Sequence, residues 1–493
     1  MRSRDNIIKN SSGTLLSLSS LPSKDGIGTF GIEAYKFIDF LKSTRQKYWQ
    51  MLPLFPLGEG NSPYKSISCF AGEMLYIDLA FLVRDGLLSP SFLKDMPQGR
   101  VDYDEVRQYK IPLLKIAAQN FDTESVSYRR FIEQNEFWLE DYALFAAALD
   151  IFKTDRLADL SGGIKYRIPT DMRYFSEQHF EEIEFHKIMQ YLFFKQFFEL
   201  KSYAQSCGIK FIGDIPFYVS ADSADVWKNP DYFAVGRDFA PTLMAGVPPD
   251  IFSESGQLWG NPIYNWENHR KDDYLWWRRR LGAMADMFDV IRIDHFRAFA
   301  DYYVISKGSP SAKDGHWEKG EGIRFWNTVE KHLGRLCIIA EDLGGEDSPI
   351  VAELVKKTGF PNMKVLQFAF TGDPHNCFLP QNFTSCCVCY TGTHDNDTTL
   401  GWYNSADRKT RAVFDAYLAP DGKNNEVYRM IGAAAASSAT LMIIPMQDWL
   451  CLDSSARMNT PGTASDNWEW RLECLDFSES FIKDVRTLAK RKK

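Results

Sequence analysis

The sequence predicts an α/β fold, a (β/α)8 TIM barrel, from two observations. Short apolar runs that end in polar, Gly or Pro residues recur along the chain, and segments with helical spacing lie between them. Three of the runs, DVIRID, CIIAED and CVCYTGTHD, end at acidic residues, Asp294, Glu341 and Asp395. In a parallel α/β barrel the strands are buried and the first polar residues after them line the mouth. We therefore expect the three carboxyl groups to converge on one cleft.

Seven runs are candidates for barrel strands. With 493 residues, the chain is long enough for several domains or for one elaborated barrel. We expect a single catalytic barrel domain over residues 1–493, with no separate C-terminal β-sandwich. The candidate strands are YWQMLPL, KFIGDIP, DVIRID, CIIAED, KVLQFAF, CVCYTGTHD and LMIIPMQD.

Two long insertions are expected between the barrel strands. Residues 82–206 contain FWLEDYALFAAALDIFK and FHKIMQYLFFKQFFELKSYA, whose apolar residues recur at helical spacing, so this stretch is predicted to be a helical subdomain. Residues 218–280 are rich in Gly, Pro, Trp and Asn and have little periodicity. A long irregular segment in a compact enzyme is more often a functional lid than a linker, and we expect a substrate-binding lid here.

The charge and hydropathy of the chain argue against nucleic acid and membrane partners. The net charge is -8, the pI is about 5.6, and Lys and Arg are scattered rather than gathered in a basic stripe. There is no apolar run of about 18 residues, and the N-terminal segment has no apolar core of signal-peptide length. We expect a soluble, cytoplasmic protein.

The cysteines are not expected to bind metal. The chain has nine, an odd number without paired spacing, which fits a reducing compartment better than a disulfide framework. Cys386, Cys387 and Cys389 could suggest a metal ligand set, but they lie in a strand-like run where Cys386 faces away from the other two. We interpret them as small apolar residues of a strand.

Asp294 has the properties of a nucleophile. It lies two residues after Arg292, so both side chains point to the same face of a strand. An arginine there would keep the aspartate ionised and oriented. Taken alone, the motif could also be an ordinary Arg–Asp pair at the end of a strand.

Glu341 has the properties of a general acid. It follows the apolar run CIIA and precedes Asp342, so burial and a like-charged neighbour would both raise the pKa of its carboxyl group. A raised pKa suits a group that donates a proton to a leaving oxygen. The alternative is the acidic first turn of a helix.

The loop TGTHDNDTT supplies the third carboxyl group. Asp395 could stabilise positive charge at a reacting carbon while His394 donates to a hydroxyl group. The same loop could also be a simple turn or a calcium site. Asp214, after the run KFIG, adds a fourth carboxyl group at the same end of the sheet, and on the residues alone it is the one most readily interpreted as structural.

A carboxylate nucleophile paired with a protonated carboxylic acid is the usual equipment for cleaving a glycosidic bond. The chain is therefore predicted to be a sugar-processing enzyme. This chemistry needs no metal or organic cofactor. No Gly-rich phosphate loop with its lysine is found and no HExxH motif is present, which disfavours nucleotide and zinc enzymes.

The chain resembles a known family, the 4-α-glucanotransferases called amylomaltases or disproportionating enzymes, of the α-amylase clan. The resemblance runs over nearly the whole chain. It rests on ordered motifs that include GIGTFGIEAYKFIDFL, YWQMLPLFPLGEGNSPYKS, GDIPFYVSADSADVWKNP, AGVPPDIFSESGQLWGNPIY, DVIRIDHFRAF, IIAEDLG, YTGTHDNDTTLGWY and ARMNTPGTASDNWEWR.

The resemblance implies roles for individual residues. Asp294 would be the nucleophile, Glu341 the acid and base, and Asp395 the stabiliser of the transition state. The substrates would be maltooligosaccharides and glucans derived from starch or glycogen, with glucose as an acceptor. The substrate-binding residues would be Ser62, Tyr64, Asp214, Gln257, Trp259, Arg292, His394 and Asn467.

Four positions depart from the usual family pattern. Lys65 replaces a glutamine, Glu59 an aromatic residue, Asp466 a glycine, and Thr371 an acidic or amide residue. None is one of the three catalytic carboxyl groups, so the departures bear on substrate length and on any secondary glucan site.

The main alternative activity is hydrolysis of the same α-1,4 bonds, as in α-amylases. A catalytically inactive glucan-binding protein is the alternative from another class, and the complete set of three carboxyl groups argues against it.

Overall fold

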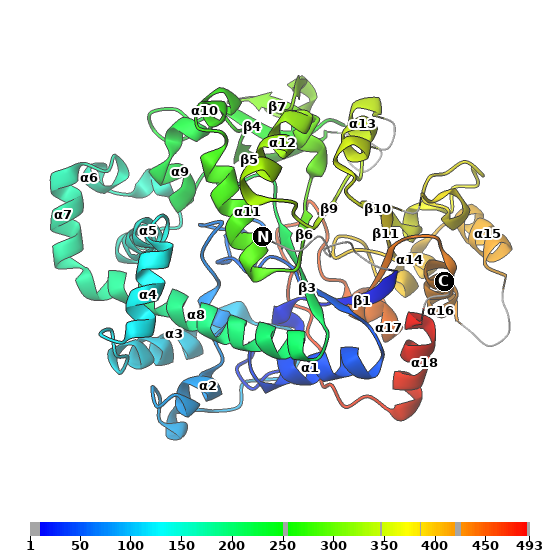
Figure 1. Ribbon diagram of the computed structural model, residues 1–493, viewed down its shortest axis with the longest axis horizontal. Helices are drawn as coiled ribbons and strands as arrows, with labels where there is room; N and C mark the ends of the chain where they lie inside the picture. The colour runs from blue at the N-terminus through cyan, green and yellow to red at the C-terminus, as the bar shows by residue number, and fades with distance from the viewer. Residues whose placement is uncertain (1–9, 250–254, 346–347, 385, 420–424, 491–493) are drawn as a thin grey trace.

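Eight parallel strands close into a barrel in chain order, as predicted. The computed structural model describes residues 10–249, 255–345, 348–384, 386–419 and 425–490 (Figure 1). Each strand pairs with the next along the chain, and β12 pairs with β1 to close the ring. The strands are β1 Ser11–Leu15, β2 Tyr48–Gln50, β3 Lys210–Ile215, β6 Val290–Ile293, β9 Ile338–Ala340, β10 Asn362–Val365, β11 Cys387–Tyr390 and β12 Leu441–Pro445.

Two strands differ from the sequence prediction. β1 has the sequence SSGTL, which carries no apolar run, so it was not among the candidates. Its Gly13 is required by packing, because a Cβ there would lie 2.5 Å from the carbonyl oxygen of Tyr48 on β2. β10 is NMKV, and the chain then turns into a 3-10 helix over Leu366–Phe368, so most of KVLQFAF lies beyond the strand.

Helices surround the barrel and contact one another around it. Contacts join α1 to α8, α11 to α12, α12 to α13, α16 to α18 and α18 to α1, so the last helix lies between α16 and the first helix. Most of them bury apolar side chains. The outer helices are α1 Ile32–Ser43, α8 Phe180–Ser206, α11 Leu275–Met287, α12 Gly322–Leu333, α13 Pro349–Thr358, α14 Thr399–Ser405, α15 Arg408–Tyr417, α16 Glu426–Ala436 and α18 Glu479–Ala489.

The predicted helical insertion between β2 and β3 consists of helices that extend to one side of the barrel (Figure 1). α5 packs along α8, and nine of its fourteen residues are buried. α8 also contacts α1 and β3, so the insertion ends in a helix that belongs to the barrel wall. The helices before α8 are α2 Leu79–Arg84, α3 Tyr103–Gln119, α4 Val126–Asn135, α5 Leu139–Phe152, α6 Gly162–Lys165 and α7 Pro169–Gln178.

The segment expected to be an irregular lid contains regular structure. Its strands β4 and β5 join β7 and β8 in an antiparallel sheet of order β5-β4-β7-β8. The Gly and Pro residues of this segment hide the alternation of apolar and polar residues by which a strand is predicted. Gly246 is required by packing, because a Cβ there would lie 2.2 Å from the carbonyl oxygen of Gln257. Residues 250–254 lie outside the described residues. The elements are α9 Ala224–Lys228, β4 Leu243–Val247, β5 Gln257–Pro262, α10 Trp266–Lys271, β7 Asp301–Ser306 and β8 His316–Lys319.

After β12 the described chain forms the short helix α17 (Met446–Trp449), an irregular segment and α18. In residues 446–490 no strand is present. Among the described helices, none has both the length and the apolar character needed to cross a membrane.

Candidate active site

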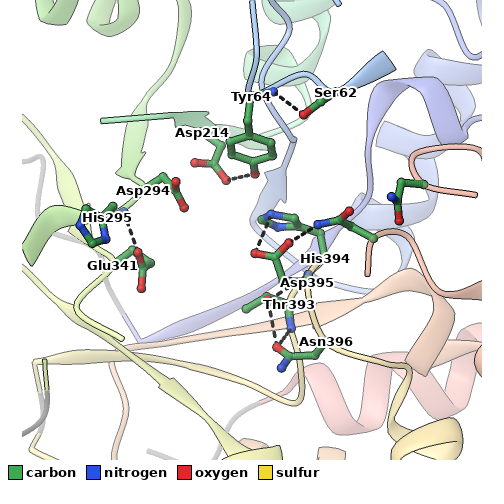
Figure 2. Close-up of polar contacts among 12 residues, drawn as sticks. Ser62, Tyr64, Asp214, Asp294, His295, Glu341, Thr393, His394, Asp395 and Asn396 are labelled. Carbon is green, nitrogen blue, oxygen red and sulfur yellow. Dashed lines mark hydrogen bonds and ion pairs between the residues drawn. The ribbon is translucent and has the colours of Figure 1, made fainter. Parts of the chain in front are cut away.

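The three predicted carboxyl groups lie at the carboxyl ends of barrel strands. Asp294 directly follows β6, Glu341 directly follows β9, and Asp395 lies in the loop after β11. Figure 2 shows the three side chains around one central space, with Asp294 and Glu341 on one side and Asp395 opposite them. Parallel strands bring the first residues beyond them to a common edge, so the barrel itself creates this arrangement.

Arg292 is shared between two carboxylates. Its side chain on β6 is only 3% exposed; Nη1 donates to both carboxylate oxygens of Asp214 at 2.7 Å, and Nη2 lies 3.1 Å from Asp294 Oδ1. Asp214 sits beside Arg292 in the β3–β6 register and is fully buried. One guanidinium therefore neutralises the buried Asp214 and also holds Asp294 in place.

Asp294 remains able to ionise at neutral pH. Burial raises the pKa of its carboxyl group to about 6, while the Arg292 guanidinium lowers it and the charges of Asp214 and Asp395 raise it. Arg292 therefore offsets part of the cost of burial, as expected from the sequence. A carboxylate that is oriented by one arginine and only partly exposed is suited to nucleophilic attack.

Glu341 lies in an environment that favours its protonated form. Its Oε2 accepts from the backbone N–H of His295 at 2.6 Å, and its Oε1 from the N–H of Leu343 at 2.9 Å. These two bonds favour the ionised form, but burial outweighs them and raises the pKa of Glu341 to about 8, and the negative charge of Asp294 adds to the rise. The sequence predicts that Asp342 is the negative charge that raises this pKa. In the structure that charge is Asp294, because Asp342 is turned toward β10, where it accepts from the Asn362 amide and the Met363 N–H.

Asp395 is held by residues that the sequence did not single out. Its Oδ1 accepts from the side-chain amide of Asn459 at 2.6 Å, and its backbone carbonyl accepts from Arg457 at 2.8 Å. His394 Nε2 lies 3.4 Å from Asp395 Oδ2. Asn459 and Arg457 belong to the motif ARMNTPG, an irregular segment without periodicity, so only the resemblance could have drawn attention to it.

The THDND loop is held by its own hydrogen bonds. Asn396 Oδ1 accepts from both the N–H and the hydroxyl of Thr393, and Asp397 accepts from Ser454. These bonds are typical of a side-chain-closed turn. In the part of the chain that the structure describes, no group of three or more His, Cys, Asp or Glu residues is placed to hold a metal ion.

Tyr64 forms one wall of the site together with His394 and Trp468. The Tyr64 hydroxyl donates to Asp214 at 3.0 Å, and its ring stacks on His394 at 5.1 Å with an interplanar angle of 15° (Figure 2). Trp468 lies behind both rings, 5.7 Å from Tyr64 and 6.0 Å from His394. Trp468 could not be identified from the sequence, because nothing in the sequence indicates which side chains an aromatic residue in a loop will contact.

The C-terminal segment that carries Trp468 is attached to the helical insertion. Tyr103 donates its hydroxyl hydrogen to the Trp468 carbonyl at 2.8 Å, and Arg471 donates to the carbonyl groups of Pro97 and Gly99. Trp468 itself has a left-handed backbone with φ of 67°, an unusual conformation for a large side chain. Such conformations persist only where the surroundings determine them, and the contacts on both sides of Trp468 do so.

The remaining predicted substrate residues lie on three separate segments of the chain. Gln257 and Trp259 lie on β5, where Trp259 Nε1 donates to Gln257 Oε1 at 3.1 Å. Ser62 Oγ accepts from the N–H of Tyr64. The amide of Asn467 bonds to Thr460 and Thr463, so it closes the turn before Trp468.

Three of the four departures from the family pattern have a physical explanation. Lys65 and Glu59 form an ion pair with an N–O distance of 2.7 Å, so the two changes compensate each other in one loop. Asp466 has a left-handed backbone with φ of 61°, a conformation that glycine adopts freely and that aspartate also tolerates. Thr371 lies in the loop after β10, where its hydroxyl accepts from the N–H of Asp373 and the amide of Asn376; nothing in the structure explains its departure.

The chain is similar to known proteins over nearly its whole length. A family model described as 4-alpha-glucanotransferase matches residues 16–476. The chain is 41% identical to the 4-alpha-glucanotransferase of Streptococcus pneumoniae over 98% of both chains, and 42% identical to that of Thermus thermophilus over 97% of both.

Solved structures agree with these matches. The amylomaltase from Streptococcus agalactiae in complex with acarbose matches with a TM-score of 0.94 at 38% identity, covering 98% of this chain and 99% of that chain. The amylomaltase from Corynebacterium glutamicum shares the fold, with a TM-score of 0.79 at 17% identity over 98% of this chain and 75% of that one. Full-length similarity, together with the carboxyl groups at the barrel mouth, leads to one conclusion: this chain belongs to the 4-α-glucanotransferase family.

Proposed function

We propose that the protein transfers a segment of α-1,4-glucan from a maltooligosaccharide donor to the 4-hydroxyl group of an acceptor sugar. The observation that carries this proposal is the contrast between two neighbouring carboxyl groups. Asp294 is paired with Arg292, whereas Glu341 lies buried beside the negative charge of Asp294, and its pKa is raised to about 8. Two carboxyl groups whose environments push their pKa values apart are the mark of a nucleophile and an acid.

The reaction is a double displacement that retains the configuration of the anomeric carbon. Asp294 attacks this carbon, the glycosidic bond breaks, and Glu341 gives its proton to the departing oxygen. The covalent glucosyl-enzyme is then attacked by the 4-hydroxyl of the acceptor, whose proton returns to Glu341 while Asp294 leaves. Asp395, held by Asn459, stabilises the positive charge that develops at the anomeric carbon in both steps.

Substrate binding is assigned to the aromatic and polar residues around the carboxyl groups. Tyr64 and His394 form the wall of the subsite for the reacting sugar, and Trp259 with Gln257 faces the acceptor from β5. Aromatic rings of this kind stack on sugar faces, and the water they exclude favours a sugar acceptor over hydrolysis. The amylomaltase from Streptococcus agalactiae was solved in complex with acarbose, which supports the binding of a sugar ligand by this chain.

The proposed substrates are maltooligosaccharides and glucans derived from starch or glycogen, with glucose as an acceptor. The nine cysteines, without paired spacing in the sequence, support a cytoplasmic location, where such thiols stay reduced. The absence of a basic stripe continues to argue against a nucleic acid partner.

The rate is expected to follow a bell-shaped pH profile. Asp294 must be ionised, so kcat/KM falls as the pH drops through its pKa of about 6; Glu341 must be protonated, so kcat/KM falls as the pH rises through its pKa of about 8. The two groups interact, so the limbs report the pair rather than either residue alone. Initial rates with a saturating acceptor across this range provide the measurement. A value of kcat/KM that stays constant from well below pH 6 to well above pH 8 would contradict the assignment.

Incubation with maltotriose alone tests the function. Transfer produces glucose and a ladder of longer maltooligosaccharides with no net gain of reducing ends, because each cleaved bond is replaced by a new one. Chromatography and a reducing-end assay on the same samples measure both quantities. Shorter sugars with a steady rise in reducing ends would identify a hydrolase of the α-amylase type instead.

A further inference from the structure

His295, the residue after the nucleophile, has a backbone conformation that most residues avoid. Its φ is 51° and its ψ is 46°, in the left-handed region. No glycine is used here, although glycine adopts this conformation freely. A strained conformation beside the reacting groups is a reason to ask what it positions.

The left-handed turn directs two consecutive peptide N–H groups at one residue. The N–H of His295 donates to Glu341 Oε2 at 2.6 Å (Figure 2). The N–H of Phe296 donates to the backbone carbonyl of Glu341 at 2.8 Å. Successive N–H groups around a left-handed residue form a concave site for an anion. Asp294 and Glu341 are thereby linked through a single residue.

The imidazole ring of His295 does not make this contact. Its Nε2 is buried and has no hydrogen-bond partner within the described parts of the chain. The ring meets Trp259 of β5 edge to face, with centroids 4.9 Å apart, and lies 6.1 Å from Tyr218. Burial lowers the pKa of the imidazole to about 4, so the ring is uncharged at neutral pH and adds no charge beside Glu341.

We propose that His295 is the positioning residue for Glu341. Its left-handed backbone directs a peptide N–H onto the carboxyl group that serves as acid and base, whereas its ring only packs against Trp259 of β5. The inference rests on the proposed function and adds a residue to its machinery. The hydrogen bond fixes the direction of the carboxyl group, and it also favours the ionised form that the second step requires.

The other charged groups around Glu341 are fixed by partners of their own. Asp294 and Arg292 face it from β6, and they are paired with each other. Arg297, two residues beyond His295, is paired with Asp301 at 2.7 Å and donates to the Gly344 carbonyl. Asp342 on the same loop bonds to β10. A change at the His295 backbone therefore alters the hydrogen bonds from this turn to Glu341 without releasing a charge.

The test compares substitutions that tolerate the left-handed backbone with one that does not. His295→Gly and His295→Asn keep this conformation accessible, whereas His295→Val, which is β-branched, disfavours it. Arg45→Val is the matched control, because Arg45 has a φ of 62°, is exposed, and precedes β2 at the opposite end of the barrel. All four variants and the wild type are assayed for maltotriose disproportionation across pH, and their folding is checked by circular dichroism.

The Val variant is expected to lose kcat by about 10²-fold, because a small misplacement of a catalytic group has an effect of this size. Its alkaline limb is expected to move to higher pH, because losing an N–H donor disfavours the ionised form of Glu341. The Gly and Asn variants should keep the wild-type limb, as should Arg45→Val.

Two results would overturn the proposal: an equal loss in the Gly, Asn and Val variants, which would assign the role to the ring, or an unmoved limb in the Val variant. If the Val variant does not fold, the Gly and Asn variants decide, since a shifted limb in either contradicts the proposal. Failure of the wild type itself to disproportionate maltotriose would instead contradict the proposed function.

Discussion

The Asp294→Ala variant is expected to lose transfer activity by roughly 10⁴-fold or more while keeping its fold, since removal of a covalent nucleophile eliminates the intermediate itself. Alanine leaves Arg292 paired with Asp214, so the buried guanidinium keeps a partner. The measurement is the initial rate of maltotriose disproportionation, with the fold checked by circular dichroism. Asp342→Asn is the matched control, because it removes a nearby carboxylate that is bonded to β10, and it should retain most of the activity.

The stability of Asp294→Ala should depend on pH in a defined direction. The folded pKa of Asp294, about 6, lies above its ordinary value of 3.8, so the fold gains stability from the protonated form at low pH and loses it as the pH rises through 6. The alanine variant escapes this loss. Its Tm relative to wild type should therefore be higher at about pH 7 than at about pH 4.

The activity measurement also has an outcome that would contradict the assignment. If Asp294→Ala kept a turnover near that of the wild type, the nucleophile would have to be another residue.

The Glu341→Gln variant is expected to lose about 10³- to 10⁴-fold in kcat with maltotriose, because general acid and base catalysis supplies an effect of this order. Glutamine keeps the shape of the side chain and can still accept from the His295 N–H, but it cannot donate a proton to a leaving sugar. The alkaline limb of the pH profile should disappear as well, since the group that produces it is gone. Both are measured from initial rates across pH.

A donor that needs no proton separates the two steps of this variant. With maltosyl fluoride, the fluoride ion leaves without an acid, so Glu341→Gln should release a burst of fluoride and then accumulate a maltosyl-enzyme visible by mass spectrometry. Acceptor attack remains slow because no base is present. The absence of a burst, combined with normal binding of the donor, would argue that Glu341 has a role other than acid and base.

The barrel and its three carboxyl groups could be predicted from the sequence because both leave a local signal. A buried strand is a run of apolar residues, and the first acidic residue beyond it stands out. β1 gives no such signal, because SSGTL is mostly polar and is buried only by the strands and helices that pack around it. The sheet of β4, β5, β7 and β8 was missed for a related reason, since Gly246 serves close strand packing and looks like a loop residue.

The supporting residues of the site could not be predicted, because their roles depend on contacts between distant parts of the chain. Asn459 meets Asp395 across 64 positions, and Tyr103 meets Trp468 across 365. Nothing in either local segment indicates the partner. The ion pair of Lys65 and Glu59 is similar, since in the sequence they are two separate departures and only the folded loop makes them one compensated change.

The attachment of the Trp468 segment to residues 97–103 has a consequence for how the protein is made. This segment follows β12, so a ribosome has already produced all eight strands and the three carboxyl groups before it emerges. Chains fold from the N-terminus as they are synthesised. We expect the nascent barrel to contain its reactive groups but not the wall behind Tyr64 and His394 until the Trp468 segment has emerged. The site is thus completed only after the barrel strands, and a growing chain stays inactive toward glucan until that segment has docked on residues 97–103.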